Sequence, residues 1–553
     1  MSHKNTRPGM SAPVSNPITE GVIWKQILFF FFPLLLSSFF QQLYNTADAL
    51  IVGRIAGKEA LSAVGGPAGS LLNIFIMFFI GFSGGASVPV AQYFGAKKED
   101  TLRETIRVSL LICSVIGLIG AAICFGAARL ILTAMRTPDD VLTPSLPYLH
   151  IVAPGLIPCA VYNMEAASLR AMGDSRRPLA VLVFTCLTNI VLDLFFVAVL
   201  GMGASGAAVA TALCHLLSAL LALFFLKRTL NGLSLTSSLR TPVTADLAGS
   251  VDGAVPADSV NMPVPADMAV PADMAVPADM ADTADSANMA AFTDLADSAD
   301  PAVPAGGENI AEKTGRMGFG GKSQKIRIPS RPRIPKDIAR RILRMGLPLG
   351  FSEVTFTFAN LILMSVVNRL GTDTVAAYAA YGKIDAIFWM VVGSFGISIT
   401  TFVGQNIGAG RWDRVMQSIR ECALMMFLVM GVVIGTLYYF SYPLQHLFCT
   451  DLAVVEIGTR MMHFLMPFYF LYIPIEILFG SLRGMGDSVI PTLITFFGVC
   501  LLRSAWGLFI VPFHYTINMI LLGFPVTWCV CDIAFLIYFR MYLRRRKPDS
   551  IED

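Results

Sequence analysis

Long apolar segments, separated by short polar stretches, recur along the whole chain. Each run is long enough to cross a hydrocarbon core of about 30 Å as an α-helix. Because the runs are continuous, they favour helices over a transmembrane β-barrel, whose strands alternate apolar and polar positions. The pattern predicts twelve membrane-spanning helices at residues 22–53, 61–91, 104–128, 141–170, 178–200, 203–227, 341–369, 374–406, 414–440, 454–483, 490–511 and 515–540.

The composition agrees with this pattern. Hydrophobic residues make up 55% of the 553 residues and charged residues only 14%, whereas a soluble domain carries about 25% charged residues. We therefore expect an all-α integral membrane protein. The ten cysteines and six histidines lack the spacing of a disulfide framework or a metal cluster, so we expect no cofactor.

Basic residues are distributed unevenly between the predicted loops. Lys97 and Lys98 follow the second span, Arg176 and Arg177 follow the fourth, and the alternate loops carry few basic residues. By the positive-inside bias, these loops and both termini are expected in the cytoplasm, as in a multi-pass protein of the cell (inner) membrane. Because topology explains the basic clusters, we expect no nucleic-acid partner.

The sequence repeats itself in two separate places. The motif SLRAMGDSRRP at 168–178 returns as SLRGMGDSVIP at 481–491, and AQYFGAKKED at 91–100 returns as GQNIGAGRWD at 404–413, both at a shift of 313 residues. Each half contains six spans, so the two halves have the same orientation. We expect two six-helix lobes related as parallel repeats by a pseudo-twofold axis along the membrane normal.

Between the halves lies a segment rich in Ala, Pro and Asp, which includes the repetitive stretch MPVPADMAVPADM. It has too little large apolar surface to fold by itself, so we expect a disordered cytoplasmic linker. The expected organisation is a cytoplasmic N-terminal tail at 1–21, an N-lobe at 22–228, the linker at 229–339, a C-lobe at 340–540 and a cytoplasmic tail at 541–553.

The repeated MGDS loops have the sequence of a helix end followed by a helix start. The glycine suits the left-handed position after a helix, and Asp or Ser can cap the next helix. We interpret these loops as structural. The alternative is a gating role, in which the loops lock when the cleft between the two lobes faces inward.

Polar side chains inside the predicted spans gather on three helices of the N-lobe. Gln41, Tyr44 and Asp48 share one face of the first span, Asn189 and Asp193 share one face of the fifth, and Thr211 lies in the sixth. Counted from the outer ends of the spans, Asp48, Asp193 and Thr211 lie about 9–12 Å below the outer surface. This common depth predicts a shared site.

Two carboxylates close together in a medium of low dielectric constant cannot both ionise cheaply. Either one of them stays protonated or a cation lies between them. The sequence therefore predicts a site for H⁺ or Na⁺. The alternative is that each polar group only forms hydrogen bonds that hold the helices together.

The second half does not copy this site. At the shift of 313 residues, Asn189 corresponds to Leu502 and Asp193 to Trp506. The candidate buried charges of the C-lobe, which form a second tier of site residues, are Glu353, Asp385, Glu476 and Arg503. A structural ion pair is one interpretation of each of them.

The segment LYNTADALIVGRIAG in the first span, the Q.(F/I)GA loops and the LR(A/G)MGDS loops together resemble the multidrug and toxic compound extrusion (MATE) family. The resemblance covers about 22–228 and 340–540 and is strongest to the DinF-like prokaryotic branch. It implies that the cation-coupling residues, for H⁺ or Na⁺, are Asp48, Asn189, Asp193 and Thr211. It also implies that Gln41 and Tyr44 line the substrate pocket.

The resemblance further implies an antiporter that exports organic cations or other amphipathic small molecules in exchange for H⁺ or Na⁺ by alternating access. The expected partners are these substrates and membrane lipid, and the expected state is a monomer. A lipid-linked oligosaccharide or lipid flippase is the alternative, but it would need several arginines in the cleft, and Arg503 stands alone inside a span. An ion channel would need a filter or a ring of pore charges, and an enzyme would need a catalytic constellation, neither of which the sequence contains.

Overall fold

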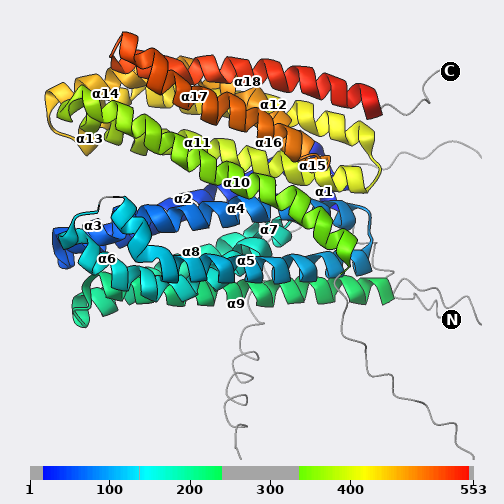
Figure 1. Cartoon of the computed structure of the whole chain (residues 1–553). Coiled ribbons are helices and arrows are strands. Elements are labelled where there is room, and N and C mark those ends of the chain that lie inside the picture. The colour runs from blue at the N-terminus through cyan, green and yellow to red at the C-terminus, as the bar shows by residue number, and fades with distance from the viewer. Residues whose placement is uncertain (1–15, 136, 239–334, 547–553) are drawn as a thin grey trace, which may run out of the picture. The chain divides into compact units, whose positions relative to one another are not determined.

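The structure is a computed structural model that describes residues 16–135, 137–238 and 335–546. It consists of helices joined by short loops (Figure 1). We call residues 23–238 the first bundle and residues 336–546 the second bundle. The helices of the first half are α1 (Pro17–Glu20), α2 (Ile23–Ile55), α3 (Gly57–Gly65), α4 (Pro67–Gly95), α5 (Glu99–Ala134), α6 (Asp139–Val152), α7 (Leu156–Ala171), α8 (Arg176–Asp193) and α9 (Gly203–Ser238).

The second half follows the same order of long helices and short connections. Its helices are α10 (Lys336–Val367), α11 (Thr372–Gly408), α12 (Trp412–Tyr439), α13 (Ser441–Phe448), α14 (Leu452–Leu465), α15 (Tyr472–Gly484), α16 (Val489–Thr495), α17 (Leu502–Ala505) and α18 (Ile517–Arg546). Within the described residues, twelve helical segments are long and apolar enough to cross a membrane. The predicted all-α membrane fold is therefore confirmed.

Two of these segments, the fourth and the tenth, are each built from two α-helices. The 3₁₀ segment η1 (Ala153–Gly155) joins α6 to α7, and the 3₁₀ segment η5 (Met466–Leu471) joins α14 to α15. Pro154 and Pro467 lie in these segments. Proline has no backbone N–H and clashes with the preceding turn, so it disfavours a regular α-helix at these two positions.

The fifth and eleventh segments contain wider helical turns at matching positions. The π-helix η2 (Leu194–Val199) continues α8 directly after Asp193. In the second half, η6 (Phe496–Leu501) precedes α17, and η7 (Trp506–Ile510) follows it. Trp506 is the position that corresponds to Asp193 at a shift of 313, so the backbone irregularity is repeated although the side chain is not.

The helices α2 and α10 each pack into both bundles. Ile27 and Leu34 in the first half of α2 belong to the hydrophobic core of the second bundle, whereas Val52 belongs to the core of the first. In α10 the order is reversed, because Ile342 packs in the first bundle and Val366 in the second. The start of the first long helix of each half therefore packs in the core of the other half.

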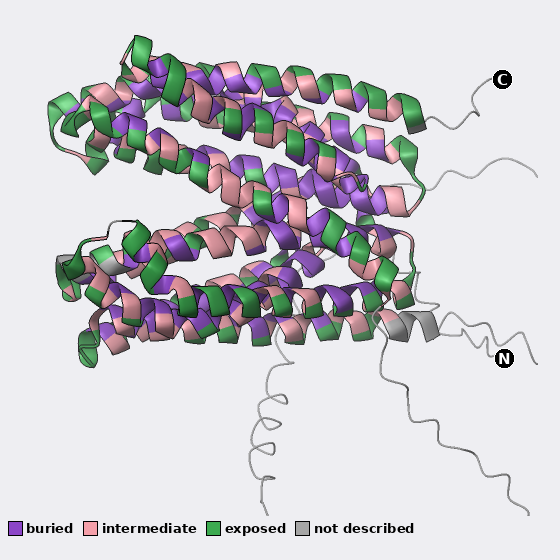
Figure 2. Cartoon of the chain, viewed as in Figure 1, coloured by how far each residue is buried: buried purple, intermediate pink, exposed green. Residues whose placement is uncertain are grey.

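The two bundles contact each other at one end of the helices, which we call the basic end because its loops carry Lys97, Lys98, Arg176, Arg177 and Arg411. Glycines permit the close approach there. An ideal Cβ on Gly95 of α4 would lie 2.0 Å from the carbonyl oxygen of Gln405. The matching Cβ on Gly408 of α11 would lie 1.9 Å from the carbonyl oxygen of Gln92. The backbones of α4 and α11 are therefore in direct contact. Figure 2 shows this part of α11 as buried, in an unbroken run from residue 398 to 406.

The MGDS loops form the helix ends that their sequence predicts. Gly173 has φ +93° and Gly486 has φ +95°, so both glycines occupy the left-handed region expected after a helix. The Oδ1 atom of Asp174 accepts hydrogen bonds from the backbone N–H groups of the first two residues of α8. Asp487 differs, because its carboxylate accepts a hydrogen bond from the hydroxyl of Tyr538.

The helices extend further into the expected linker than its boundaries of 229 and 339 indicate. The helix α9 continues to Ser238, and α10 begins at Lys336. The end of α9 is held by Arg177, which donates a hydrogen bond to the hydroxyl of Thr229, and by Arg103, which donates one to the carbonyl oxygen of Leu230. The rest of the expected linker lies outside the described residues.

Candidate functional site

The polar residues predicted in the N-lobe come from three helices that pack together. Asp48 lies on α2, Asn189 and Asp193 lie at the end of α8, and Thr211 lies on α9. The helix α8 packs against both α2 and α9, and α2 also contacts α9. These four side chains lie between positions 48 and 211 of the sequence. The three helices therefore bring them into one region of the first bundle.

These side chains are buried or half-buried, and their polar neighbours are mainly one another, as between Asp48 and Asp193. Asn189 and Asp193 have 0% exposure and Thr211 has 9%. Both oxygens of Asp193, both polar atoms of the Asn189 amide, the Thr211 hydroxyl, Oδ1 of Asp48 and the Tyr44 hydroxyl are buried atoms without a hydrogen-bond partner among the described residues. Buried polar atoms are nearly always hydrogen-bonded in native proteins. This group of unsatisfied atoms therefore indicates a place where an ion or a solvent molecule belongs.

The two carboxyl groups interact with each other. The carboxyl group of Asp48 lies within interaction range of that of Asp193, and both interact electrostatically with Tyr44 on α2 and Tyr148 on α6. Tyr148 has only 4% exposure. We did not predict Tyr148 from the sequence, because no motif connects the fourth span to the acidic pair. Gln41, in contrast, is exposed and does not belong to the buried part of the cluster.

The chemistry of this cluster is that of a site for a hard cation or a proton. Carboxylate, amide and hydroxyl oxygens are the ligands that hard cations prefer. Among the described residues no group of three or more His, Cys, Asp or Glu side chains is arranged to hold a metal ion. The cluster contains only two acidic groups, which fits a monovalent charge better than a divalent metal.

The backbone next to Asp193 departs from a regular α-helix. Asp193 is the last residue of α8, and the π-helix η2 begins at the following residue. Single π-helical turns inside α-helices occur frequently at functional sites. The wider turn places Asp193 at a point where the regular ladder of backbone hydrogen bonds changes register.

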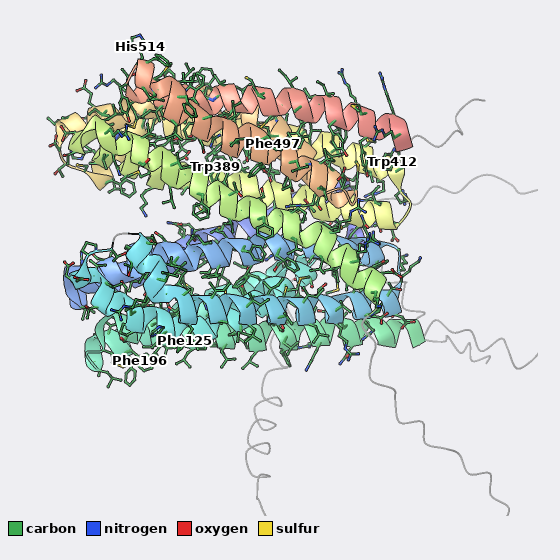
Figure 3. All side chains as sticks on the ribbon, viewed as in Figure 1. Phe125, Phe196, Trp389, Trp412, Phe497 and His514 are labelled. Atoms are coloured by element: carbon green, nitrogen blue, oxygen red, sulfur yellow. The ribbon has the colours of Figure 1, made fainter. Side chains whose placement is uncertain are left out.

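In the second bundle, Asp385 on α11 is a well-satisfied carboxylate. The indole Nε1 of Trp389, which is labelled in Figure 3, donates a hydrogen bond to Oδ2 of Asp385 at 2.8 Å, and the hydroxyl of Tyr469 donates one to Oδ1. The hydroxyls of Tyr381 and Tyr469 are 2.8 Å apart. Neutral donors therefore hold Asp385, which forms no salt bridge within the described residues and interacts with the guanidinium of Arg503 electrostatically at longer range.

Glu353 and Glu476 lie near Arg483, which we did not select from the sequence. Both carboxyl groups interact electrostatically with the guanidinium of Arg483. Within the described residues, neither has an oxygen within 4.0 Å of an Arg483 nitrogen. Arg483 donates hydrogen bonds to Oγ1 of Thr400 at 2.8 and 3.1 Å. A Cβ on Gly396 would lie 1.7 Å from Oε1 of Glu476, so this glycine makes room for the Glu476 side chain.

Arg503 is buried, and no acidic side chain lies within 4.0 Å of its guanidinium in the described chain. It has 2% exposure, and its guanidinium lies 4.2 Å from the centre of the Phe524 ring. It donates a hydrogen bond to Oγ1 of Thr527 at 3.2 Å. Within the described ranges Arg503 takes part in no salt bridge, and its interaction with the carboxyl group of Asp385 is a longer-range electrostatic one. A cation–π contact with Phe524 also stabilises the charge of Arg503.

Sequence reasoning missed two further carboxyl groups inside the helical segments. Glu165 on α7 has 0% exposure, and Asp532 on α18 has a buried Oδ1 without a hydrogen-bond partner in the described residues. Each stands alone on its helix, so no spacing pattern identifies it. A search for every single carboxylate within an apolar span would have found both.

Comparison with known proteins agrees with this architecture. A family model described as MatE matches residues 33–195 and 348–508, which together are more than half of the chain. The chain is 23% identical over 538 residues to the probable multidrug resistance protein YoeA of Bacillus subtilis, covering 95% of each sequence. It is 21% identical over 484 residues to the probable multidrug resistance protein NorM of Thermotoga maritima, covering 86% of this chain and 83% of that protein.

Solved structures show the same fold. A structure described as a MOP superfamily transporter from Pyrococcus furiosus aligns with a TM-score of 0.72 at 18% identity, covering 97% of this chain and 100% of that one. A structure described as the outward-facing conformation of a multidrug resistance MATE family transporter aligns with a TM-score of 0.71 at 18% identity, covering 97% and 99%.

Proposed function

The chain belongs to the MatE family of multidrug efflux transporters, and on that premise we propose that it is an antiporter that exports organic cations or amphipathic compounds in exchange for H⁺ or Na⁺. The observation that carries this proposal is the buried cluster around Asp48 and Asp193. Its polar atoms lack hydrogen-bond partners among the described residues, and a bound cation or proton would satisfy them.

Each residue of the cluster has a distinct role in this proposal. Asp48 and Asp193 supply the negative charge that holds the coupling ion. Asn189 and Thr211 supply neutral oxygens that complete the ligand set for Na⁺ or accept hydrogen bonds when a proton is bound. Tyr44 lies beside the two acids and, with Gln41 three residues earlier on α2, faces the substrate.

The coupling follows from the cost of an unpaired charge inside the membrane. When the ion leaves, two carboxylates remain in a medium of low dielectric constant, and an organic cation that enters the bundle can compensate them. When the ion returns, this compensation is lost and the substrate is released. Ion and substrate therefore compete for one negative site, which is the requirement for exchange.

Alternating access requires that one end of the transporter opens while the other closes. The contacts between α4 and α11 close the basic end. By the positive-inside bias, the proposed orientation has the basic end and both termini in the cytoplasm, and we propose a multi-pass monomer of the cell (inner) membrane. The conformation described here is then the one in which the cytoplasmic end is shut.

Exchange can be measured directly with the purified full-length protein in proteoliposomes. A fluorescent organic cation is loaded, and its efflux is driven in turn by a pH gradient and by a sodium gradient. We expect Asp193→Asn to abolish gradient-driven exchange. The matched control is Asp532→Asn, which removes another carboxyl group within a span and should retain exchange. Full coupling in a folded Asp193→Asn protein would overturn the assignment.

A further inference from the structure

A second buried carboxyl group of the first bundle lies apart from the acidic pair. Glu165 is on α7, six residues before the end of this helix at Ala171, which places it about 9 Å from the basic end. Asp48 is on α2, seven residues before the opposite end of the bundle at Ile55. Glu165 is therefore separated along the helices from the proposed site for the coupling ion.

The Glu165 side chain is fully buried and unsatisfied. It has 0% exposure, and neither Oε1 nor Oε2 has a hydrogen-bond partner among the described residues. Two hydroxyls on neighbouring helices are also buried, because Ser83 of α4 has 2% exposure and Ser109 of α5 has 0%. The Oγ atom of Ser109 lacks a partner in the described chain, and that of Ser83 has only the thiol of Cys113 nearby. Three buried polar side chains therefore come from helices that all pack against one another.

Cys113 connects these three side chains. It lies one helical turn after Ser109 on the same face of α5, its thiol contacts the hydroxyl of Ser83, and it interacts electrostatically with Glu165. The surrounding side chains are apolar, since Cys113 belongs to the core cluster that also contains Phe82 and Met164. The polar group therefore lies inside a hydrophobic core.

The other titratable groups near Glu165 do not form an ion pair with it. On its own helix, Tyr162 interacts with it electrostatically, and from α9 the exposed Lys227 does so. Lys227 is not within 4.0 Å of a Glu165 oxygen, since no salt bridge among the described residues includes either side chain. From α4 the neighbouring polar group is the hydroxyl of Ser83. The charge of an ionised Glu165 would therefore be compensated only at a distance, by the ammonium group of Lys227.

An isolated carboxylate in such a place costs several kcal/mol, and binding a proton removes this cost. A metal cation fits poorly, because hard cations such as Ca²⁺ and Mg²⁺ take about six or more oxygen ligands, whereas the described neighbourhood offers one carboxylate and two hydroxyls. A proton needs one carboxyl oxygen, and the serine hydroxyls can accept or donate the remaining hydrogen bonds.

We propose that Glu165, together with Ser83 and Ser109, is a second proton-binding site of the first bundle, located towards the basic end. The carboxyl group is protonated in the closed conformation described here. It releases its proton when the basic end opens and water reaches α7. This inference concerns proton binding itself, so it does not depend on which substrate or coupling ion the transporter uses.

The test is infrared difference spectroscopy of the full-length protein in lipid, recorded as a function of pH. The wild type should show the C=O stretching band of a protonated carboxyl group, which disappears as the pH is raised. Glu165→Gln, which has nearly the same shape, should lack this band and release about one proton fewer per protein over the same pH range. Glu104→Gln, which changes an exposed glutamate of α5, is the matched control and should keep the band.

The serines provide a second measurement that does not need the Glu165 variant to fold. In the double variant Ser83→Ala, Ser109→Ala, the band of the protonated carboxyl group should shift, because its hydrogen-bond partners are gone. Identical spectra for the wild type and a folded Glu165→Gln protein would overturn the proposal. A Glu165 band that does not change with pH would overturn it too, because such a group never releases its proton. A band unmoved by the double variant would remove the serines from the site.

Discussion

Gln92 of α4 and Gln405 of α11 make the same bond in opposite directions across the interface of the two bundles. Nε2 of Gln92 donates a hydrogen bond to the carbonyl oxygen of Gly484 at 2.9 Å, and Nε2 of Gln405 donates one to the carbonyl oxygen of Ala171 at 2.7 Å. Donors and acceptors are both related by the shift of 313 residues that relates the two halves of the sequence. The repeated motifs therefore bind each other, and the pair holds the basic end closed.

We expect the double variant Gln92→Ala, Gln405→Ala to loosen the basic end. Each lost bond contributes about 0.5–1.5 kcal/mol and leaves a buried carbonyl oxygen unsatisfied. Hydrogen–deuterium exchange measured by mass spectrometry should become about tenfold faster in the MGDS loops. Gln417→Ala changes a glutamine in an exposed contact on α12 and should leave the exchange of both loops unaltered. If the double variant behaves like this control, the glutamine pair does not hold the closed state.

Close packing of α4 on α11 predicts that a single methyl group disrupts the interface. Gly408→Ala would place a Cβ 1.9 Å from the carbonyl oxygen of Gln92, and backbone atoms cannot move aside as a side chain can. We expect a loss of about 1–3 kcal/mol of stability, seen as a lower Tm in detergent. The control is Gly431→Ala on α12, where the added Cβ meets no atom within 4 Å. Equal Tm values for the two variants would contradict the close approach.

Substitution of the neutral ligands in the acidic cluster distinguishes Na⁺ from H⁺ as the coupling ion. Removing the amide oxygen with Asn189→Ala takes away a ligand of Na⁺, whereas a proton is held by the carboxyl groups alone. If Na⁺ is the coupling ion, its apparent affinity should fall about tenfold, which corresponds to about 1.4 kcal/mol. Sodium dependence of efflux in proteoliposomes measures this effect. Asn163→Ala, at an asparagine that bonds within its own helix α7, should cause no such fall.

If both gradients drive efflux equally well before and after Asn189→Ala, then the amide is not a ligand. If only pH-driven efflux exists and it survives the substitution, the coupling ion is the proton. In either case Thr211→Ala should have the same effect as Asn189→Ala, because the hydroxyl of Thr211 is also a neutral oxygen ligand in the proposed site.

In the second bundle, the hydrogen bond from Trp389 to Asp385 predicts a structural role for the indole. Trp389→Phe keeps the aromatic ring but removes the donor that lies 2.8 Å from Oδ2. One oxygen of a partly buried carboxylate then loses its partner, so we expect a loss of about 1–3 kcal/mol. Thermal unfolding should show a lower Tm. Trp412→Phe, at a tryptophan with 37% exposure, serves as the control, and an equal change in both variants would refute the role.

Much of the architecture follows from the sequence because its signals are local. Apolar runs determine where a span begins and ends, since a bilayer accepts only helices with satisfied backbone groups. The glycines of the MGDS loops likewise take the left-handed conformation at Gly173 and Gly486, because the requirement for such a residue lies within a few positions of it. The candidate acids were visible for the same reason, as carboxylates inside apolar segments.

Other features depend on contacts between distant segments. The guanidinium of Arg503 lies over the face of Phe524, and no spacing rule along the sequence gives that contact. Asp385 has Tyr469 as a partner from another helix. Glu165 was overlooked because a lone carboxylate has no sequence pattern, and its importance comes from its complete burial close to Cys113.

The sequence by itself determined the membrane class, the helical segments, the duplication and the acids of the first-span and fifth-span motifs, because hydropathy, repeats and short spacings are properties of neighbouring positions along one chain. Only the tertiary structure decided which polar atoms are left without partners and which charges are neutralised. It also decided that α2 and α10 each pack into both bundles. Those outcomes depend on which helices meet and at what distance. Hydrogen bonds and electrostatic interactions fall off too steeply with distance for a pattern along the chain to predict them.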